Sequence, residues 1–365
     1  MEKILVLRGG ALGDFIVTLP ALALLRRHWP AARIELAGNA TAAQLALPVA
    51  ATALPSTRSR TGASADQHCH PLDDKTPKPR GIAKTTCHLM DDTTGERAEF
   101  GERGPGGLID AAHSQHEARW AALYAAGPLP GEFEEWLGTF DLVLNCWPDP
   151  EGSLRGKFPC GQGQIFLSAE ALPTRAPAAG HYCAPLSELG LATEEYFYRL
   201  QPIANAPVQG LHLPTEWRVR DNPPCLAIHP GSGSPTKNWP LERWAALCAW
   251  LRAEHRVELL IVTGEADSRA GEFLAHFGKR AHCLPLRELA ARLAECRLFL
   301  GHDSGVSHLA AACGVPCVLL FGPTDPAMWA PPAAHVRVVK DGPTLDSIAL
   351  EKIQATVAPL LAERT

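Results

Sequence analysis

The second half of the chain alternates short apolar segments with amphipathic ones, and this alternation restricts the possible folds most strongly. Between the apolar segments, the spacing of apolar residues predicts helices, such as one over 240–255. Strands that alternate with helices in this way form a parallel sheet covered by helices, so we expect an α/β domain. The predicted strands are CLAIH (225–229), VELLIVTG (257–264), RLFLGH (297–302) and PCVLLFG (316–322).

The first half begins with the same pattern. KILVLR (3–8) predicts a strand, and the apolar spacing over 15–29 predicts a helix that ends before Pro30. With 365 residues, the chain is longer than one hydrophobic core usually supports. We therefore expect two α/β domains with a ligand cleft between them, followed by a C-terminal helix. These parts are residues 1–205, 206–345 and 346–365.

The segment 56–107 does not fit either domain. Only 11 of its 52 residues are apolar, whereas the whole chain is 46% apolar, so the segment cannot bury enough surface to offset the entropy of ordering. We predict a disordered insertion within the first domain. Its histidines and cysteines, at 68–70 and 87–88, have a spacing that matches no standard zinc finger.

Composition excludes several classes of protein. The formal net charge of −5 argues against a duplex nucleic-acid binder, which normally carries a basic surface. The apolar run that begins at Ile4 is too short for a signal-peptide core, and no run reaches the length of a membrane-spanning helix, so we expect a cytoplasmic protein. The 11 cysteines are scattered without a CxxC pair, which favours unpaired thiols.

Polar residues follow the first predicted strand in the turn GGALGD (9–14). One interpretation makes Asp14 a helix cap, since Asp is favoured at helix N-termini. A dinucleotide-binding fingerprint is the second interpretation, but the GxGxxG spacing is absent. In the third, Asp14 is a general base, and Gly10 and Gly13 let a substrate approach the backbone.

Two turns in the second half combine glycines with polar groups. In HPGSGSPTKNWP (229–240), backbone amides, hydroxyls and Lys237 favour anion binding, although a solvated lysine on a polar turn is the alternative. In HDSGVSH (302–308), the amides at the start of the next helix favour the same chemistry, and the alternative is an N-cap with a packed histidine. Glu265, at the end of another strand, is a candidate partner for a ribose diol. The chain has no DxD, GxSxG or HExxH motif.

These segments resemble the heptosyltransferase-type glycosyltransferases of family nine. The resemblance rests on ILVLRGGALGDFIVTLPAL near the start, and on HPGSGSPTKNWPLERW and GHDSGVSHLAAACGVPCVLLFGPTDP in the second half. It implies a GT-B fold, with two Rossmann-like domains facing an interdomain cleft and a C-terminal helix. It also implies inverting transfer of a sugar, heptose in the family, from an ADP-activated donor to the lipopolysaccharide inner core, without a metal or other cofactor.

The resemblance also assigns roles to individual residues. Asp14 takes the position of the family's base, with Gly10 and Gly13 in the acceptor-side loop. Lys237 matches the lysine on the diphosphate, where it would assist departure of the leaving group. Ser304 stands where threonine is common in the family. The other donor-binding positions are Ser232, Gly233, Glu265, Leu284, Asp303, Ser304, Gly305 and His308.

Two other functions stay open on the sequence alone. One is a family member that binds glycans or nucleotide sugars without turnover, and the other is an NAD-dependent dehydrogenase on paired Rossmann domains. The expected partners are a nucleotide-sugar donor and a lipopolysaccharide core or other glycan acceptor, with no nucleic acid. Basic clusters such as Arg26-Arg27-His28-Trp29 are compatible with a peripheral contact at the inner face of the cytoplasmic membrane.

Overall fold

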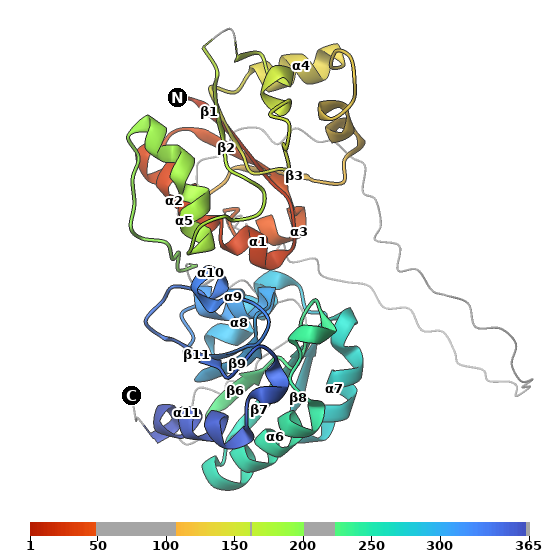
Figure 1. Cartoon of the computed structure of the whole chain (residues 1–365), viewed down its shortest axis with the longest axis vertical. Coiled ribbons are helices and arrows are strands. Elements are labelled where there is room, and N and C mark those ends of the chain that lie inside the picture. Colours follow the sequence, from red (N-terminus) through yellow and green to blue (C-terminus); the bar gives the residue numbers. More distant parts are fainter. Residues whose placement is uncertain (49–106, 161–162, 201–222, 363–365) are drawn as a thin grey trace, which may run out of the picture. The chain divides into compact units, whose positions relative to one another are not determined.

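The computed structural model describes residues 1–48, 107–160, 163–200 and 223–362 (Figure 1). Almost all of the predicted insertion 56–107, including its histidine and cysteine clusters, lies outside these residues, and so does the predicted domain boundary at 205–206.

The first half forms a five-stranded parallel sheet with the order β3-β2-β1-β4-β5. This is the Rossmann order, in which the strand order reverses beside β1 and ligands bind at the carboxyl ends of the strands. The strands are β1 (Lys3–Arg8), β2 (Arg33–Gly38), β3 (Ala111–Ser114), β4 (Leu142–Asn145) and β5 (Ile165–Ser168).

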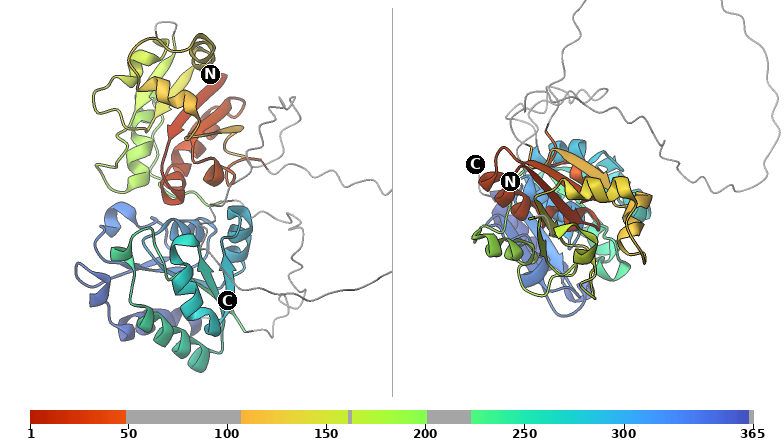
Figure 2. Two further views of the ribbon diagram at one scale, coloured as in Figure 1. Left: turned by 90° about the vertical axis from the view of Figure 1, so that its right-hand side faces the viewer. Right: turned by 90° about the horizontal axis from the view of Figure 1, so that it is seen from above.

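Both faces of this sheet are buried, which explains why its central strand is apolar without alternation. Ile4 and Val6 of β1 pack on one face with α1, α2, α3 and α5, whereas Leu5 and Leu7 pack on the other with α4. Figures 1 and 2 show these helices around the strands. The helices are α1 (Leu12–Ile16), α2 (Leu19–His28), α3 (Ala40–Ala43), α4 (Gly131–Gly138) and α5 (Ala178–Cys183).

The second half forms a six-stranded parallel sheet with the order β11-β10-β9-β6-β7-β8, a second Rossmann arrangement centred on β6 and β9. The strands are β6 (Cys225–Ile228), β7 (Glu258–Thr263), β8 (Lys279–His282), β9 (Leu298–His302), β10 (Cys317–Phe321) and β11 (Val336–Lys340). The two parallel α/β sheets confirm the predicted fold class.

Helices again cover both faces of the second sheet. α8 and α9 pack on one face, and α6, α7 and α11 on the other. The helix predicted near the C-terminus is α11. The helices are α6 (Leu241–His255), α7 (Ser268–Leu274), α8 (Leu286–Ala294), α9 (Gly305–Ala312), α10 (Pro326–Trp329) and α11 (Leu350–Ala362).

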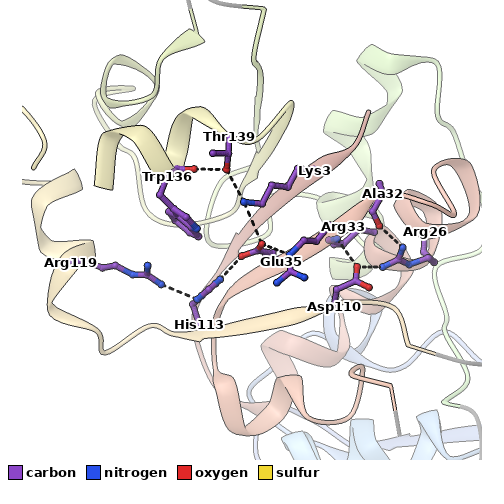
Figure 3. A network of polar contacts seen from close by, with 11 residues as sticks. Lys3, Arg26, Ala32, Arg33, Glu35, Asp110, His113, Arg119, Trp136 and Thr139 are labelled. Atoms are coloured by element: carbon purple, nitrogen blue, oxygen red, sulfur yellow. Dashed lines mark hydrogen bonds and ion pairs between the residues drawn. The ribbon is translucent and has the colours of Figure 1, made fainter. Parts of the chain in front are cut away.

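A polar network joins the first three strands of the first sheet (Figure 3). At its centre, the buried Glu35 carboxylate accepts hydrogen bonds from His113 Nε2 at 2.7 Å and Arg33 Nε at 2.7 Å, and it pairs with Lys3. Burial by itself raises the pKa of Glu35, but these donors and charges outweigh it and lower the pKa to about 2. The network therefore holds an ionised carboxylate inside the domain at neutral pH.

Candidate active site

The carboxylate of Asp14 is held in place by two protein groups. Its Oδ1 lies 2.9 Å from Arg8 Nη2, and its Oδ2 accepts a hydrogen bond from the backbone amide of Ala11 at 2.8 Å. Gly10 has φ +104°, and a Cβ there would lie 2.5 Å from Asp14 Oδ2, so only glycine fits beside the carboxylate. Ala11 is the N-cap of α1 and Asp14 its third residue, so the bond to Ala11 stabilises the start of the helix, although Asp14 is not the cap itself. The side chain nevertheless remains one-third exposed.

The turn that carries Asp14 packs directly against the start of α9. A Cβ on Gly305 would lie 2.9 Å from the backbone nitrogen of Gly13 and 2.9 Å from Leu12 Cβ. A Cβ on Gly13 would in turn contact the ring of His308 at 3.6 Å. The absence of side chains at both glycines thus lets α1 and α9 approach closely. This contact brings the candidate base next to the start of α9, one of the segments predicted to bind the donor.

The candidate donor loop, residues 231–239, follows β6 and is held by hydrogen bonds to His302 at the end of β9. One ring nitrogen of His302, Nε2, accepts from the backbone amide of Trp239 at 2.9 Å, and Nδ1 lies 3.3 Å from the carbonyl oxygen of Gly231. Burial lowers the pKa of His302 to about 3, so the ring is neutral at pH 7 and can donate at Nδ1 while accepting at Nε2. His302 therefore fixes both ends of the 231–239 loop.

Within this loop, Lys237 forms an ion pair with Asp303. The distance from Lys237 Nζ to Asp303 Oδ2 is 2.9 Å, and the carboxylate is 9% exposed while the lysine is 32% exposed. Ser232 Oγ lies 2.7 Å from both Ser234 O and Asn238 Oδ1, and Gly233 is exposed. The ammonium group is thus held beside α9 and stays accessible to an anion.

The turn between β9 and α9 presents the start of an eight-residue helix. The Ser304 hydroxyl caps the helix by accepting from the amide of Ser307 at 3.3 Å, so both the cap proposed as the alternative and an anion-binding helix start are compatible with this turn. Amides in the first turn of a helix have no partner inside it and favour negative charge. Lys237, although paired with Asp303, and the amides at the start of α9 therefore offer hydrogen-bond donors to an anion from neighbouring segments.

His308 lies one turn into α9 and is buried. Burial lowers its pKa, and the nearby Lys237 acts in the same direction, whereas Asp303 and Asp14 act against the shift. The imidazole is therefore neutral at pH 7 and can offer a hydrogen bond to an anion, not a full positive charge.

Glu265 and Leu284 lie just beyond the carboxyl ends of two neighbouring strands. Glu265 follows β7 and is exposed, and Leu284 follows β8 and is half-buried. An exposed carboxylate and an apolar side chain at adjacent strand ends fit a ribose and a base, respectively.

Two residues of the candidate site, Arg8 and Gln115, were not singled out from the sequence, and His302 was noted in the HDSGVSH turn without a role of its own. Arg8 stands at the end of an otherwise apolar strand, and such a charged terminal residue is the signal that could have drawn attention to it. Gln115 follows β3, and its Oε1 accepts from the amide of Gly10 at 3.0 Å. No local pattern distinguishes Gln115 from an ordinary surface residue.

The neutral state of His302 predicts a dependence of stability on pH. Its pKa is lower in the folded than in the unfolded protein, so as the pH falls below 6.5 the unfolded state takes up a proton that the folded state does not. Down to about pH 3, the free energy of unfolding should fall by about 1.4 kcal/mol per pH unit from this residue alone. Urea titrations between about pH 5.5 and 4 measure the free energy of unfolding as a function of pH. The slope of this dependence should be smaller in His302→Gln than in the unaltered chain by this amount. Equal slopes would contradict the buried neutral histidine.

Among the residues that the structure describes, no group of three or more His, Cys, Asp or Glu side chains is arranged to hold a metal ion. The nine cysteines in the same parts of the chain are free thiols. In these parts, too, no helix has both the length and the apolarity needed to cross a membrane.

Solved structures of glycosyltransferases share this two-sheet fold. The glycosyl transferase family 9 structure from Veillonella parvula aligns with a TM-score of 0.66 at 20% identity, covering 100% of this chain and 98% of that one. The structure of the ADP-heptose lps heptosyltransferase II of Escherichia coli aligns with a TM-score of 0.60 at 16% identity, covering 98% of each chain. The fold is therefore that of the GT-B-like heptosyltransferase structures.

Sequence comparison finds similarity to one family in the second half of the chain. Residues 185–353, which include α9 and the loop after β6, match the model of Glycosyltransferase family 9 (heptosyltransferase). Lipopolysaccharide heptosyltransferase 2 of Escherichia coli is 30% identical over 32% of this chain and 36% of its own length. Lipopolysaccharide heptosyltransferase 1 of Pseudomonas aeruginosa is 36% identical over 28% of this chain and 30% of its own length. The chain thus spans less than two-fifths of the length of these relatives.

Proposed function

We propose that the chain is a heptosyltransferase that moves heptose from ADP-heptose to the inner core of lipopolysaccharide, at the inner face of the cytoplasmic membrane. The first domain would bind the acceptor and the second the donor. The contact between the turn of Asp14 and the start of α9, across Gly13 and Gly305, is the observation that carries the proposal. This contact places the Asp14 carboxylate next to hydrogen-bond donors that can bind an anion. Sugar transfer in one displacement step requires both, a base for the acceptor hydroxyl and donors for the leaving diphosphate.

In this mechanism, Asp14 accepts the proton of the acceptor hydroxyl while the hydroxyl oxygen attacks the anomeric carbon of the donor. The bond from that carbon to the diphosphate oxygen breaks, and ADP leaves from the opposite face, which inverts the configuration. Lys237, the His308 imidazole and the amides of Ser304 and Gly305 would stabilise the charge that develops on the leaving diphosphate. In the proposed mechanism, no metal ion or cofactor takes part.

The remaining residues would bind the nucleotide. Glu265 would accept hydrogen bonds from the ribose hydroxyls, and Leu284 would contact the adenine. Ser232 and Gly233 would lie along the diphosphate, and Asp303 would orient the Lys237 ammonium through the observed ion pair.

Calorimetric titration with ADP, UDP, GDP and NAD tests the proposal first. We expect selective binding of ADP, weakened at least tenfold in Lys237→Ala because the ammonium is lost from the diphosphate site. Lys157→Ala is the control, since Lys157 bonds to the carbonyl oxygens of Ala125 and Gly127 in the first half of the chain. Preference for UDP or GDP would mean that the donor carries that nucleotide instead of ADP. Binding of NAD alone would favour a dehydrogenase.

Transfer itself separates an enzyme from a protein that only binds. ADP-heptose should react with lipopolysaccharide that either lacks heptose or carries a single heptose. The acceptor that is extended shows whether the chain adds the first or the second heptose. ADP binding without transfer to either acceptor would favour the non-catalytic alternative.

A further inference from the structure

We propose that Arg8 is a positioning residue, which holds the Asp14 carboxylate in the orientation that receives the acceptor proton. The inference rests on the proposed function, since Asp14 is a base only in that reaction. Arg8 is the last residue of β1 and is 5% exposed, an unusual place for an arginine unless its charge and hydrogen bonds are matched.

The guanidinium group of Arg8 contacts Asp14 twice. Its Nη2 lies 2.9 Å from the carboxylate Oδ1, and its Nε lies 3.3 Å from the backbone oxygen of the same residue. Thr18 adds a third link, because its hydroxyl donates to Asp14 O at 2.8 Å and lies 3.3 Å from Arg8 Nε. Arg8 therefore fixes both the side chain and the main chain of the candidate base.

The guanidinium group is itself held by a rigid support. Its carbon lies 4.3 Å from the ring centroid of Tyr182, which is fully buried in α5. Arg8 Nη1 lies 3.3 Å from the carbonyl oxygen of Ala171, and the hydroxyl of Tyr182 donates to the same oxygen at 2.9 Å. Since this support belongs to the first half of the chain, the orientation of Asp14 is set there before a donor binds.

Two fixed points define the plane of the Asp14 carboxylate: Arg8 at Oδ1 and the amide of Ala11 at Oδ2. Without Arg8 the carboxylate could rotate about the remaining bond. A displacement of about 1 Å in a reacting group can lower the rate about 10²-fold. We therefore expect Arg8→Gln to lower kcat by about 10²-fold, with the KM for ADP-heptose unchanged.

A double-mutant cycle distinguishes this role from a purely structural one. The kcat for transfer from ADP-heptose to heptose-deficient or single-heptose lipopolysaccharide is measured for the unaltered chain, Arg8→Gln, Asp14→Asn and the double variant. If Arg8 acts through Asp14, Arg8→Gln causes no further loss in the Asp14→Asn background. Arg33→Gln is the matched control, because Arg33 begins β2, at the end of the strand opposite to the site, and pairs with Glu35 at 2.7 Å (Figure 3). It should lower the melting temperature but not kcat.

Independent, additive losses in the cycle would overturn the inference, and so would an unchanged kcat in Arg8→Gln. If Arg8→Gln does not fold, Arg8→Lys tests the inference instead. A single ammonium group cannot reach both the Asp14 carboxylate and the Ala171 carbonyl oxygen. Arg8→Lys should lower kcat at least tenfold, and an unchanged kcat would again overturn the inference. Full activity of Asp14→Asn would instead overturn the base itself, and therefore the proposed mechanism.

Discussion

Replacing Asp14 by Asn should lower kcat about 10²–10⁴-fold, the usual contribution of a general base, while the affinity for ADP changes little. The amide cannot accept the proton of the acceptor hydroxyl. Asp14 lies in α1, directly after β1, whereas most of the groups assigned to the donor lie after β6 and β9. Steady-state transfer kinetics and calorimetry with ADP measure the two effects separately.

Asp110→Asn is the matched control for this substitution. It weakens another Arg–Asp pair of the first half, formed with Arg26 at 2.6 Å, and should lower stability without lowering kcat. Turnover of Asp14→Asn at the rate of the unaltered chain would remove Asp14 as the base. Another side chain near α9 would then have to accept the proton.

Gly305→Ala should also abolish most of the activity, by a different route. The new Cβ would lie 2.9 Å from the Gly13 nitrogen and from Leu12 Cβ, closer than real Cβ contacts, and a backbone atom cannot move aside as a flexible side chain can. The start of α9 and the turn of Asp14 must therefore separate. A shift of about 1 Å corresponds to a loss of about 10²-fold in kcat.

Gly131→Ala provides the comparison for this effect. Gly131 is the first residue of α4, and no atom lies within 4 Å of a Cβ added there, so the substitution should leave kcat unchanged. ADP affinity of Gly305→Ala, measured by calorimetry, shows whether the donor loop has survived. Activity at the level of the unaltered chain would show that the contact between α1 and α9 is not needed for turnover.

The central strands were predictable from the sequence because they are buried on both faces. β1, β6, β7, β9 and β10 are continuous apolar segments followed by glycine or polar turns. The edge strands gave no such signal. β8 has the sequence KRAH and β11 the sequence VRVVK, and both expose most of their side chains, so their composition resembles that of a loop.

The predicted helix over 15–29 was wrong in one respect, because the structure divides it into α1 and α2. Pro20 explains the division. It has no amide hydrogen to donate, and it therefore fits the second position of a new helix better than the interior of a long one.

The positions of the site residues were predictable, but their interactions were not. Asp14, Lys237 and Asp303 follow strands, and polar residues at strand ends meet at one edge of a parallel sheet. The pairing of Lys237 with Asp303 spans 66 positions, and the support of Arg8 by Tyr182 spans 174. Such contacts depend on how the strands and helices pack, which no local pattern in the sequence reports.

The attachment of the 231–239 loop to His302 has a thermodynamic consequence. A loop that is fixed at both ends by a buried ring has already lost much of its conformational entropy when the protein folds. A diphosphate that binds there does not have to order the loop, so more of its interaction free energy appears as affinity. The same two hydrogen bonds should therefore contribute both to the stability of the second half of the chain and to the affinity for the proposed donor.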